Sequence, residues 1–207
     1  MCLTLELSGV CPSYLLRWSL GGPGLWSFPS VAVFNNPAVS VLLPVTLGAA
    51  VGYSTRPVAT KKRYMTLKQP PFRPPPWVFG PAWTTLYGLM GYAAYRAWTT
   101  GTSPLSSPAT IATTKHGATL YSIQLGLNLI WMPLFFGLNK PMAATIDVAA
   151  LVGINGYLTY LWGSVDKVAG YCLVPYVAWL SFATYLSAGT GYLNDWDLSE
   201  PGTKKVN

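Results

Sequence analysis

The chain has 207 residues and a formal net charge of +7, yet only 9% of its residues are charged. An ordinary soluble domain carries charge on about 25% of its residues, and these cover most of its surface. This chain lacks the charged residues for such a surface, so its composition argues against a soluble globular protein and favours one surrounded by lipid.

The charged residues divide the chain into long uncharged segments. A helix that crosses the ~30 Å hydrocarbon layer needs about 20 residues, and these segments fit that length. They are apolar all round and show no polar stripe of the kind that a soluble helix carries. We therefore predict an all-α integral membrane protein, a bundle of five transmembrane helices. The predicted helices lie near residues 37–55, 77–98, 117–138, 141–162 and 168–193.

Three regions follow from this division: an N-terminal extension (1–36), the membrane domain (37–194) and a polar C-terminal tail (195–207). The extension is a poor secretory signal, because Arg17 follows its apolar part and a run of glycine and proline near residue 22 breaks any helix. We expect a mostly disordered extension, and the sequence leaves open whether it is a targeting segment.

Basic residues gather in the loop between the first two predicted helices. This loop holds Arg56, Lys61, Lys62, Arg63, Lys68 and Arg73, and Lys140, Lys204 and Lys205 fall on the same side of the membrane. Because basic residues favour cytosolic loops, we predict that this loop and the C-terminus are cytosolic and that the N-terminus lies across the membrane. Topology thus accounts for most of the positive charge, and we expect no nucleic-acid partner.

The second predicted helix follows the stretch "RPPPWVFGPAW", residues 73–83. Proline fixes φ and disfavours helix in the residue before it, so the prolines from Pro70 to Pro76 predict an extended, stiff strap. Trp77 fits an aromatic belt at the membrane surface. Trp83 does not, because it lies nearly two turns inside the predicted span.

Aromatic and polar side chains share helical faces within the predicted spans. Because polar groups are costly in lipid, these faces should point into the bundle. The faces comprise Trp83 and Tyr87; Gln124, Asn128, Trp131 and Phe135; Asp147, Leu151 and Asn155; and Tyr176, Trp179, Ala183 and Leu186. Together they favour an aromatic-walled pocket for a flat hydrophobic ligand. In the alternative, Gln124, Asn128 and Asp147 only tie helices together, and for Asp147 alone we favour that interpretation.

Ordinary catalysis and metal binding find little support. His116 is the only histidine, and Cys2, Cys11 and Cys172 do not have the spacing of a metal site, so we predict neither a metal nor an enzyme of the acid–base or nucleophilic type. Gly48 and Gly52 form a GxxxG pattern, which favours close helix packing within one bundle or in a homodimer.

Three segments carry a specific resemblance to a known family. "RYMTLKQPPFRPPPWVFGPAWTTLYGLMGYAAYRAW", "QLGLNLIWMPLFFG" and "VPYVAWLSFATYL" resemble the translocator protein / tryptophan-rich sensory protein family (TspO/MBR), and the first resembles its fungal members. The resemblance implies a five-helix bundle, commonly a homodimer, whose pocket binds porphyrins and haem. It implies the mitochondrial outer membrane or, as in plant members, the secretory pathway, which begins at the endoplasmic reticulum.

The resemblance also assigns residues. The family's pocket positions fall on Trp83, Tyr87, Gln124, Asn128, Trp131, Phe135, Phe136, Trp179, Ala183 and Leu186. We therefore predict a membrane protein that binds tetrapyrroles and similar hydrophobic ligands, with a carrier or sensor role and no resident cofactor. The alternative is a light-dependent porphyrin-degrading enzyme, because some bacterial members use the tryptophans matching Trp83 and Trp179 for that reaction.

Several positions depart from the family pattern. Ala143 stands where the family has a tryptophan, and Ala188 and Tyr192 stand where animal members have the Tyr and Arg of a proposed cholesterol motif. Ala143 changes the pocket wall, and the absence of the Tyr and Arg argues against sterol binding at that place, so a sterol or lipid transporter is only a further alternative.

Overall fold

The computed structural model describes residues 30–54 and 67–198, and 84% of these residues are helical. No strand occurs in these two ranges, so the predicted all-α class is confirmed. The elements are α1 Ser30–Asn35, α2 Pro37–Ser54, α4 Pro76–Gly101, α5 Pro108–Met132, the π-helix η1 Pro133–Gly137, α6 Pro141–Val165 and α7 Lys167–Leu193.

Local sequence signals set where the long helices begin. Pro76, Pro108 and Pro141 each begin a helix, where a residue without an N–H is tolerated and its fixed φ suits the first turn. The Ser107 hydroxyl accepts a hydrogen bond from the Thr110 N–H at 3.1 Å and caps α5. The Asp166 carboxylate accepts from the Val168 N–H at 2.7 Å and caps α7 in the same way.

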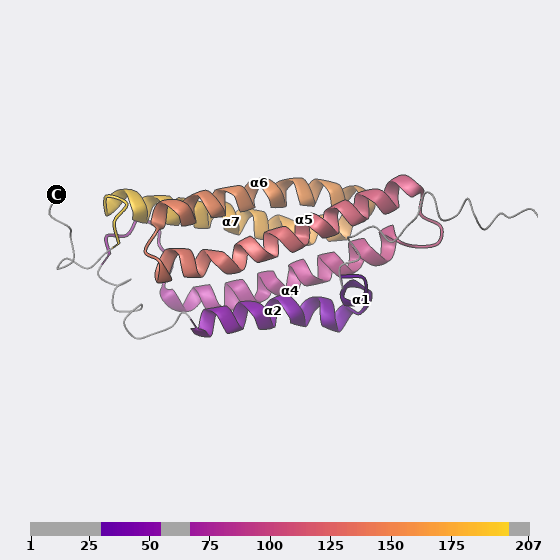
Figure 1. Ribbon diagram of the computed structural model, residues 1–207, viewed down its shortest axis with the longest axis horizontal. Coiled ribbons are helices and arrows are strands. Elements are labelled where there is room, and N and C mark those ends of the chain that lie inside the picture. The colour runs from indigo at the N-terminus through magenta and orange to yellow at the C-terminus, as the bar shows by residue number, and fades with distance from the viewer. Residues whose placement is uncertain (1–29, 55–66, 199–207) are drawn as a thin grey trace, which may run out of the picture.

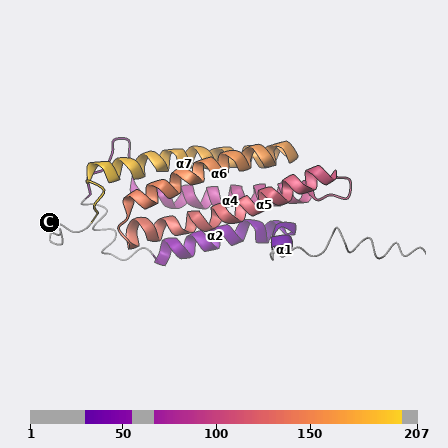
Figure 2. The same cartoon turned by 45° about the horizontal axis from the view of Figure 1, so that its top comes forward.

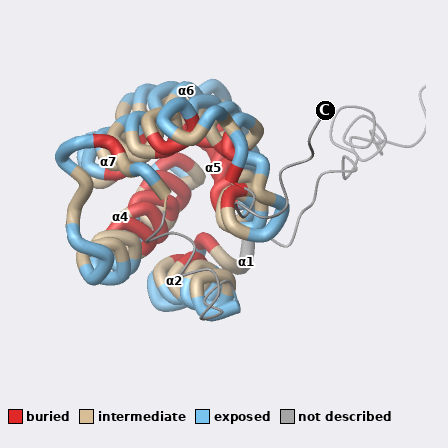
Figure 3. The backbone as a smooth tube through the Cα atoms, turned by 90° about the vertical axis from the view of Figure 1, so that its left-hand side faces the viewer, coloured by how far each residue is buried: buried red, intermediate tan, exposed pale blue. Residues whose placement is uncertain are grey.

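The five long helices run side by side along the long axis of the molecule (Figure 1, Figure 2). Seen end on, they form a closed ring in the order α2, α5, α6, α7, α4, in which each helix packs against its two neighbours (Figure 3). One end of the ring carries α1 and the α4–α5 and α6–α7 turns, and we call it the α1 end. The other carries η1 and the C-terminal end of α7, and we call it the η1 end (Figure 1).

Small residues allow α4 to pack closely against its neighbours. Ala93, Ala94 and Ala97 have no solvent exposure. A side chain at Gly91 would collide with the Ser40 backbone of α2, and one at Gly48 would collide with the Tyr87 ring. Gly48 therefore serves packing between α2 and α4 inside one chain.

Four helical segments have the length and hydropathy of membrane spans: Pro37–Ser54, Pro108–Gly137, Pro141–Val165 and Lys167–Leu193. These confirm a multi-pass membrane protein. The 26-residue α4 is not among the four, because its tryptophans, tyrosines, glycines and prolines rank low on hydropathy scales. The predicted fifth span thus stays a prediction.

Some helix boundaries differ from the predicted ones, because a capping residue sets them and not the start or end of the apolar run. α5 begins at Pro108, ahead of the predicted residue 117, because the Ser107 cap precedes a polar first part. Within the predicted extension, α1 forms a short helix, and Phe34 of α1 packs 5.7 Å from Trp98 and 5.6 Å from Tyr121 between ring centroids. Predictions on residues 1–29, on Arg56, Lys61, Lys62 and Arg63, and on residues 199–207 lie outside the described residues.

Candidate ligand site within the helix ring

Four aromatic rings from α4 and α7 meet inside the bundle. The Trp83 ring lies 5.6 Å from Tyr87, 6.3 Å from Tyr176 and 6.5 Å from Trp179, measured between ring centroids. Trp83 and Trp179 stand nearly perpendicular, at 87°. Tyr87 and Tyr176 are buried, whereas Trp83 and Trp179 are half-buried, so the two tryptophans form the more accessible part of this cluster.

The same wall continues along α7 toward the η1 end. Trp179 also contacts Phe79 and Phe182, at 6.0 Å and 5.8 Å between centroids. Ala183 and Leu186 follow Trp179 at one and two turns and are half-buried. A small residue at 183 keeps the wall flat beside the Trp179 ring, which suits contact with a planar molecule.

Below the tryptophans, buried polar groups from four helices form one hydrogen-bonded network. The Tyr87 hydroxyl donates to Asn128 Oδ1, and Asn128 Nδ2 donates to the Tyr176 hydroxyl at 3.0 Å. The Tyr176 hydroxyl in turn donates to Gln124 Oε1 at 3.0 Å, which also accepts from Asn155 Nδ2 at 3.3 Å. The network therefore ties α4, α5, α6 and α7 together.

The network bears on whether the amide side chains of Gln124 and Asn128 line a ligand pocket or only tie helices together. Gln124 and Asn128 are buried at 0% and 5% exposure, and their oxygens already accept hydrogen bonds from the protein. Their direct effect is to hold helices in register, and to hold Tyr87 and Tyr176 beneath the tryptophans. A direct ligand contact by either amide stays a prediction.

The other predicted aromatic residues gather near η1. The Trp131 ring stacks on Phe135 at 5.2 Å, and Phe136 packs edge-on to both. Phe135 is buried together with Ala144 and with Leu198 of the predicted C-terminal tail. The structure thus places Phe135 in a second cluster at the η1 end, while Trp131 packs against both this cluster and the main core, against which Trp83 and Trp179 also pack.

Asp147 lies outside the network that its helical face predicted. It is half-buried, and its Oδ2 atom is buried without a hydrogen-bond partner among the residues that the structure describes. Leu151 and Asn155 of the same predicted face are fully buried, and Asn155 alone of the three joins the network. The preferred interpretation, in which Asp147 ties helices through a hydrogen bond, receives no support from Oδ2.

The strap that precedes α4 runs along the C-terminal part of α7. Lys68 and Asn194 exchange two hydrogen bonds, at 3.1 Å from the Lys68 N–H and 2.9 Å to its carbonyl. The Tyr185 hydroxyl donates to the Pro71 carbonyl at 3.1 Å, and Pro70 fills the space beside Gly189. The proline-rich strap is therefore fastened to the helix that carries Trp179.

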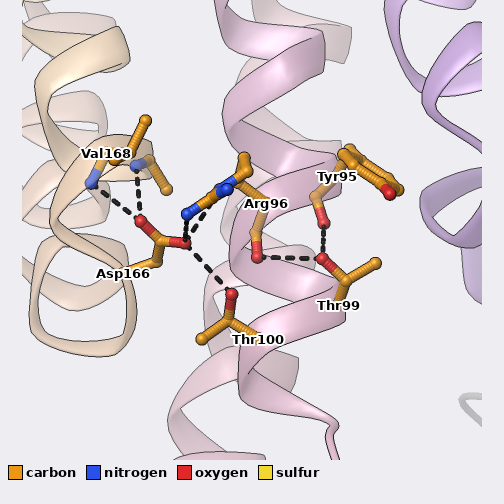
Figure 4. A network of polar contacts seen from close by, with 7 residues as sticks. Tyr95, Arg96, Thr99, Thr100, Asp166 and Val168 are labelled. Atoms are coloured by element: carbon orange, nitrogen blue, oxygen red, sulfur yellow. Dashed lines mark hydrogen bonds and ion pairs between the residues drawn. The ribbon is translucent and has the colours of Figure 1, made fainter.

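An ion pair that the sequence analysis missed joins three helices at the α1 end (Figure 4). Arg96 of α4 contacts Asp166 Oδ2 through Nη2 at 2.8 Å and Nε at 3.0 Å, and the Thr100 hydroxyl donates to the same oxygen at 3.0 Å. Burial raises the pKa of Asp166, but hydrogen bonds from the Ala169 and Val168 N–H groups, Thr100 and Arg96 outweigh it and lower that pKa overall. The available signal was that each partner is a charged residue near the end of a predicted span.

Comparisons with known proteins agree with the architecture. The TspO/MBR family profile matches residues 40–193. The chain is 41% identical to the "Translocator protein homolog" of Schizosaccharomyces pombe over 74% of this chain and 88% of that protein. It is 36% identical to the human "Translocator protein" over 73% of this chain and 86% of that protein.

Similarity extends to prokaryotes. The "Tryptophan-rich protein TspO" of Chlorobaculum tepidum is 36% identical over 74% of this chain and 94% of the bacterial protein. The matched region covers α2 and α4–α7, with the tryptophans of the cluster. The chain is therefore a multi-pass membrane protein that belongs to the TspO/MBR family.

Proposed function

We propose that this protein binds tetrapyrroles, porphyrin or haem, and similar flat hydrophobic molecules inside the helix ring. The ligand lies against Trp83 and Trp179, with Ala183 and Leu186 extending the wall. The observation that carries the proposal is the perpendicular Trp83–Trp179 pair, half-buried above a floor of hydrogen-bonded Tyr87 and Tyr176. Such a site offers aromatic faces for stacking and few exposed polar groups.

The membrane arrangement forms part of the proposal. α4 is the fifth span, because it packs against all four of the other long helices and its 26 residues would reach across about 30 Å of hydrocarbon. The η1 end and the C-terminus face the cytosol, and the mitochondrial outer membrane is the proposed location, with the endoplasmic reticulum as the alternative. A homodimer is proposed on the family resemblance.

A titration with protoporphyrin IX tests the ligand proposal. Protein in nanodiscs is titrated, and the dissociation constant is read from the shift of the porphyrin's Soret band. Trp83→Phe and Trp179→Phe should each weaken binding by about three- to tenfold, the equivalent of about 0.5–1.5 kcal/mol of aromatic contact. Trp77→Phe, at a position of α4 that is 74% exposed, is the matched control and should bind as the wild type does. Unchanged affinity in both pocket variants would refute the site.

The same tryptophan pair favours one second candidate, light-dependent porphyrin degradation. Trp83 and Trp179 are close enough for both rings to touch one bound ligand. Illumination of the complex separates binder from enzyme. Loss of the Soret band that requires the protein and disappears in Trp83→Phe would favour degradation, whereas a stable band would favour binding alone.

A further inference from the structure

Four aromatic side chains from four elements meet at the α1 end of the ring. The Phe34 ring of α1 lies 5.7 Å from Trp98 of α4 and 5.6 Å from Tyr121 of α5, measured between ring centroids. The Tyr121 ring in turn stacks on Trp162 of α6 at 5.5 Å. All four residues are buried, with exposed fractions between 1% and 7%. These residues, which we call the aromatic layer, therefore connect four elements across this end of the bundle.

Small residues bring the long helices into close contact at the same end. A side chain at Gly101 of α4 would collide with α5, and one at Gly117 of α5 would collide with the Trp162 ring of α6. A side chain at Gly170 of α7 would collide with the Gly163 backbone of α6. The α4–α5, α5–α6 and α6–α7 interfaces are therefore tightly packed here, as small residues allow.

The side of this end next to α2 is filled by α1 (Figure 1). α1 packs against α2 and α4, and its Phe34 ring reaches across to α5. The Ser40 hydroxyl of α2 donates a hydrogen bond to the Val33 carbonyl at 2.8 Å, and Asn36 Oδ1 accepts one from the Ala38 N–H at 2.9 Å. These bonds fix α1 to the start of α2 and hold Phe34 in the aromatic layer.

α1 is the element of this layer that depends most on its contacts. The other three rings lie on helices of at least 25 residues, whereas Phe34 lies on a helix of six. A helix of six residues is not stable by itself in water, so burial of Phe34 and Val33 and the bond from Ser40 keep α1 in place. The family match begins at residue 40 and does not include α1.

Two polar atoms of the aromatic layer lower the cost of releasing α1. The Tyr121 hydroxyl and Trp162 Nε1 are buried without a hydrogen-bond partner among the described residues. Leaving such groups unpaired is costly, and water that entered after α1 undocked would pair with them. Undocking therefore recovers part of the free energy that is lost when Phe34 leaves the layer.

We infer that α1 is a plug, in which Phe34 completes the aromatic layer and keeps water and dissolved molecules out of the bundle at the α1 end. Undocking of α1 uncovers Trp98 and Tyr121 and admits water there. While α1 is docked, a ligand inside the ring cannot leave through this end, which favours binding over passage across the bilayer. The plug does not depend on which ligand the ring holds.

Thiol labelling of the full-length protein tests the plug. On a background in which the three native cysteines are serine, Ala118→Cys is the reporter. Position 118 is buried one turn before Tyr121 and one turn after Thr114, on the face of α5 that contacts α4. Protein in nanodiscs reacts with a charged, water-soluble methanethiosulfonate, and mass spectrometry gives the rate. The reporter should react at least about a hundredfold more slowly than Leu105→Cys, at a position that is 97% exposed.

Three variants carrying the reporter assign the protection to α1. Phe34→Ala should raise the labelling rate at least about tenfold, because it removes the ring that covers Tyr121. Ser40→Ala keeps Phe34 and removes the bond to Val33, and the loss of one hydrogen bond should raise the rate by about two- to tenfold. Val39→Ala, at a position of α2 that is 40% exposed, is the control and should stay within about twofold.

Circular dichroism shows whether each variant keeps its helices, and Ser40→Ala decides alone if Phe34→Ala does not fold. Fast labelling of the reporter with Phe34 in place, an unchanged rate in the folded variants at 34 and 40, or an equal rise in Val39→Ala would overturn the inference. The measurement uses no ligand. Its failure would thus leave the proposed function untouched, and failure of the porphyrin titration would leave the plug untouched.

Discussion

At the scale of single residues, Asp166 combines two tasks at the α1 end. One carboxylate oxygen caps α7, and the other receives Arg96 and Thr100 from α4. Both tasks favour the ionised carboxylate, which agrees with the lowered pKa of Asp166. The residue thus fixes the α6–α7 turn to α4 at the end opposite η1.

This arrangement predicts a pH-dependent contribution to stability. Because the pKa of Asp166 in the folded protein lies below its value of about 3.9 in the unfolded chain, its stabilisation is complete well above pH 4 and is lost as the pH falls through the folded-state pKa. Asp166→Asn should lower the thermal unfolding temperature at pH 7, and the difference from wild type should shrink below about pH 4. Asp195→Asn, at an exposed position, is the control. A difference that stays constant with pH would contradict this account.

Residue periodicity predicted which side chains face inward better than it predicted their tasks. Trp83, Tyr87, Gln124, Asn128, Tyr176 and Trp179 all lie within the bundle, because helical spacing determines the face of each residue. Whether an inward amide binds a ligand or another helix depends on partners far along the chain, as between Gln124 and Tyr176. The Arg96–Asp166 pair was missed for the same reason.

At the scale of elements, packing of α2 on α4 depends on two glycines and one tyrosine. Gly91 lies against the Ser40 backbone, and Gly48 lies against the Tyr87 ring, whose hydroxyl enters the polar network. The close approach of α2 therefore holds one end of the network in place.

Two glycines of α4 give a matched comparison. Gly91→Ala should destabilise the protein by about 1–3 kcal/mol, because the new methyl group would meet backbone atoms that cannot turn away. Gly88→Ala should be neutral or stabilise by up to about 1 kcal/mol, because nothing lies within 4 Å of its added carbon and alanine favours helix. Chemical unfolding in detergent, followed by circular dichroism, measures both. Equal effects of the two substitutions would show that α2 does not pack on α4 as described.

Element boundaries were predicted only in part, because caps and tertiary contacts set them. The Ser107 cap extends α5 beyond the apolar run, and burial of Phe34 holds α1 on the bundle. The prolines predicted an extended strap, but the chain turns at Pro71 and Phe72, where Phe72 has a φ of 63°. The attachment of the strap to Asn194 and Tyr185 joins segments more than a hundred residues apart, which local sequence patterns do not report.

At the scale of the whole molecule, the ring of helices places its two ends on opposite sides of a bilayer if all five long helices cross it. The open point is whether α4 crosses the bilayer, because α4 lacks the hydropathy of the other four long helices and yet lies within the ring (Figure 3). Of its aromatic residues, Trp83, Tyr87 and Trp98 pack inside the bundle, whereas Trp77 and Tyr92 are exposed, so the composition of α4 reflects the interior of the ring only in part.

Cysteine labelling tests the five crossings. On a background in which Cys2, Cys11 and Cys172 are serine, Phe72→Cys marks the strap that precedes α4 and Leu105→Cys marks the α4–α5 turn, both at exposed positions. In sealed vesicles, a membrane-impermeant maleimide added from the cytosolic side should label only the cysteine at 72. Labelling of both from one side would exclude α4 as a span.

The central claim is that a flat hydrophobic ligand occupies the interior beside Trp83 and Trp179, and the affinity for protoporphyrin IX of Ala183→Phe against Ala178→Phe tests it most directly. Position 183 follows Trp179 on the inner wall of α7, whereas position 178 is exposed on the same helix. A phenylalanine ring at 183 should obstruct the wall and weaken binding at least about tenfold, while Ala178→Phe should bind within about twofold of wild type. Wild-type affinity in Ala183→Phe would contradict the account.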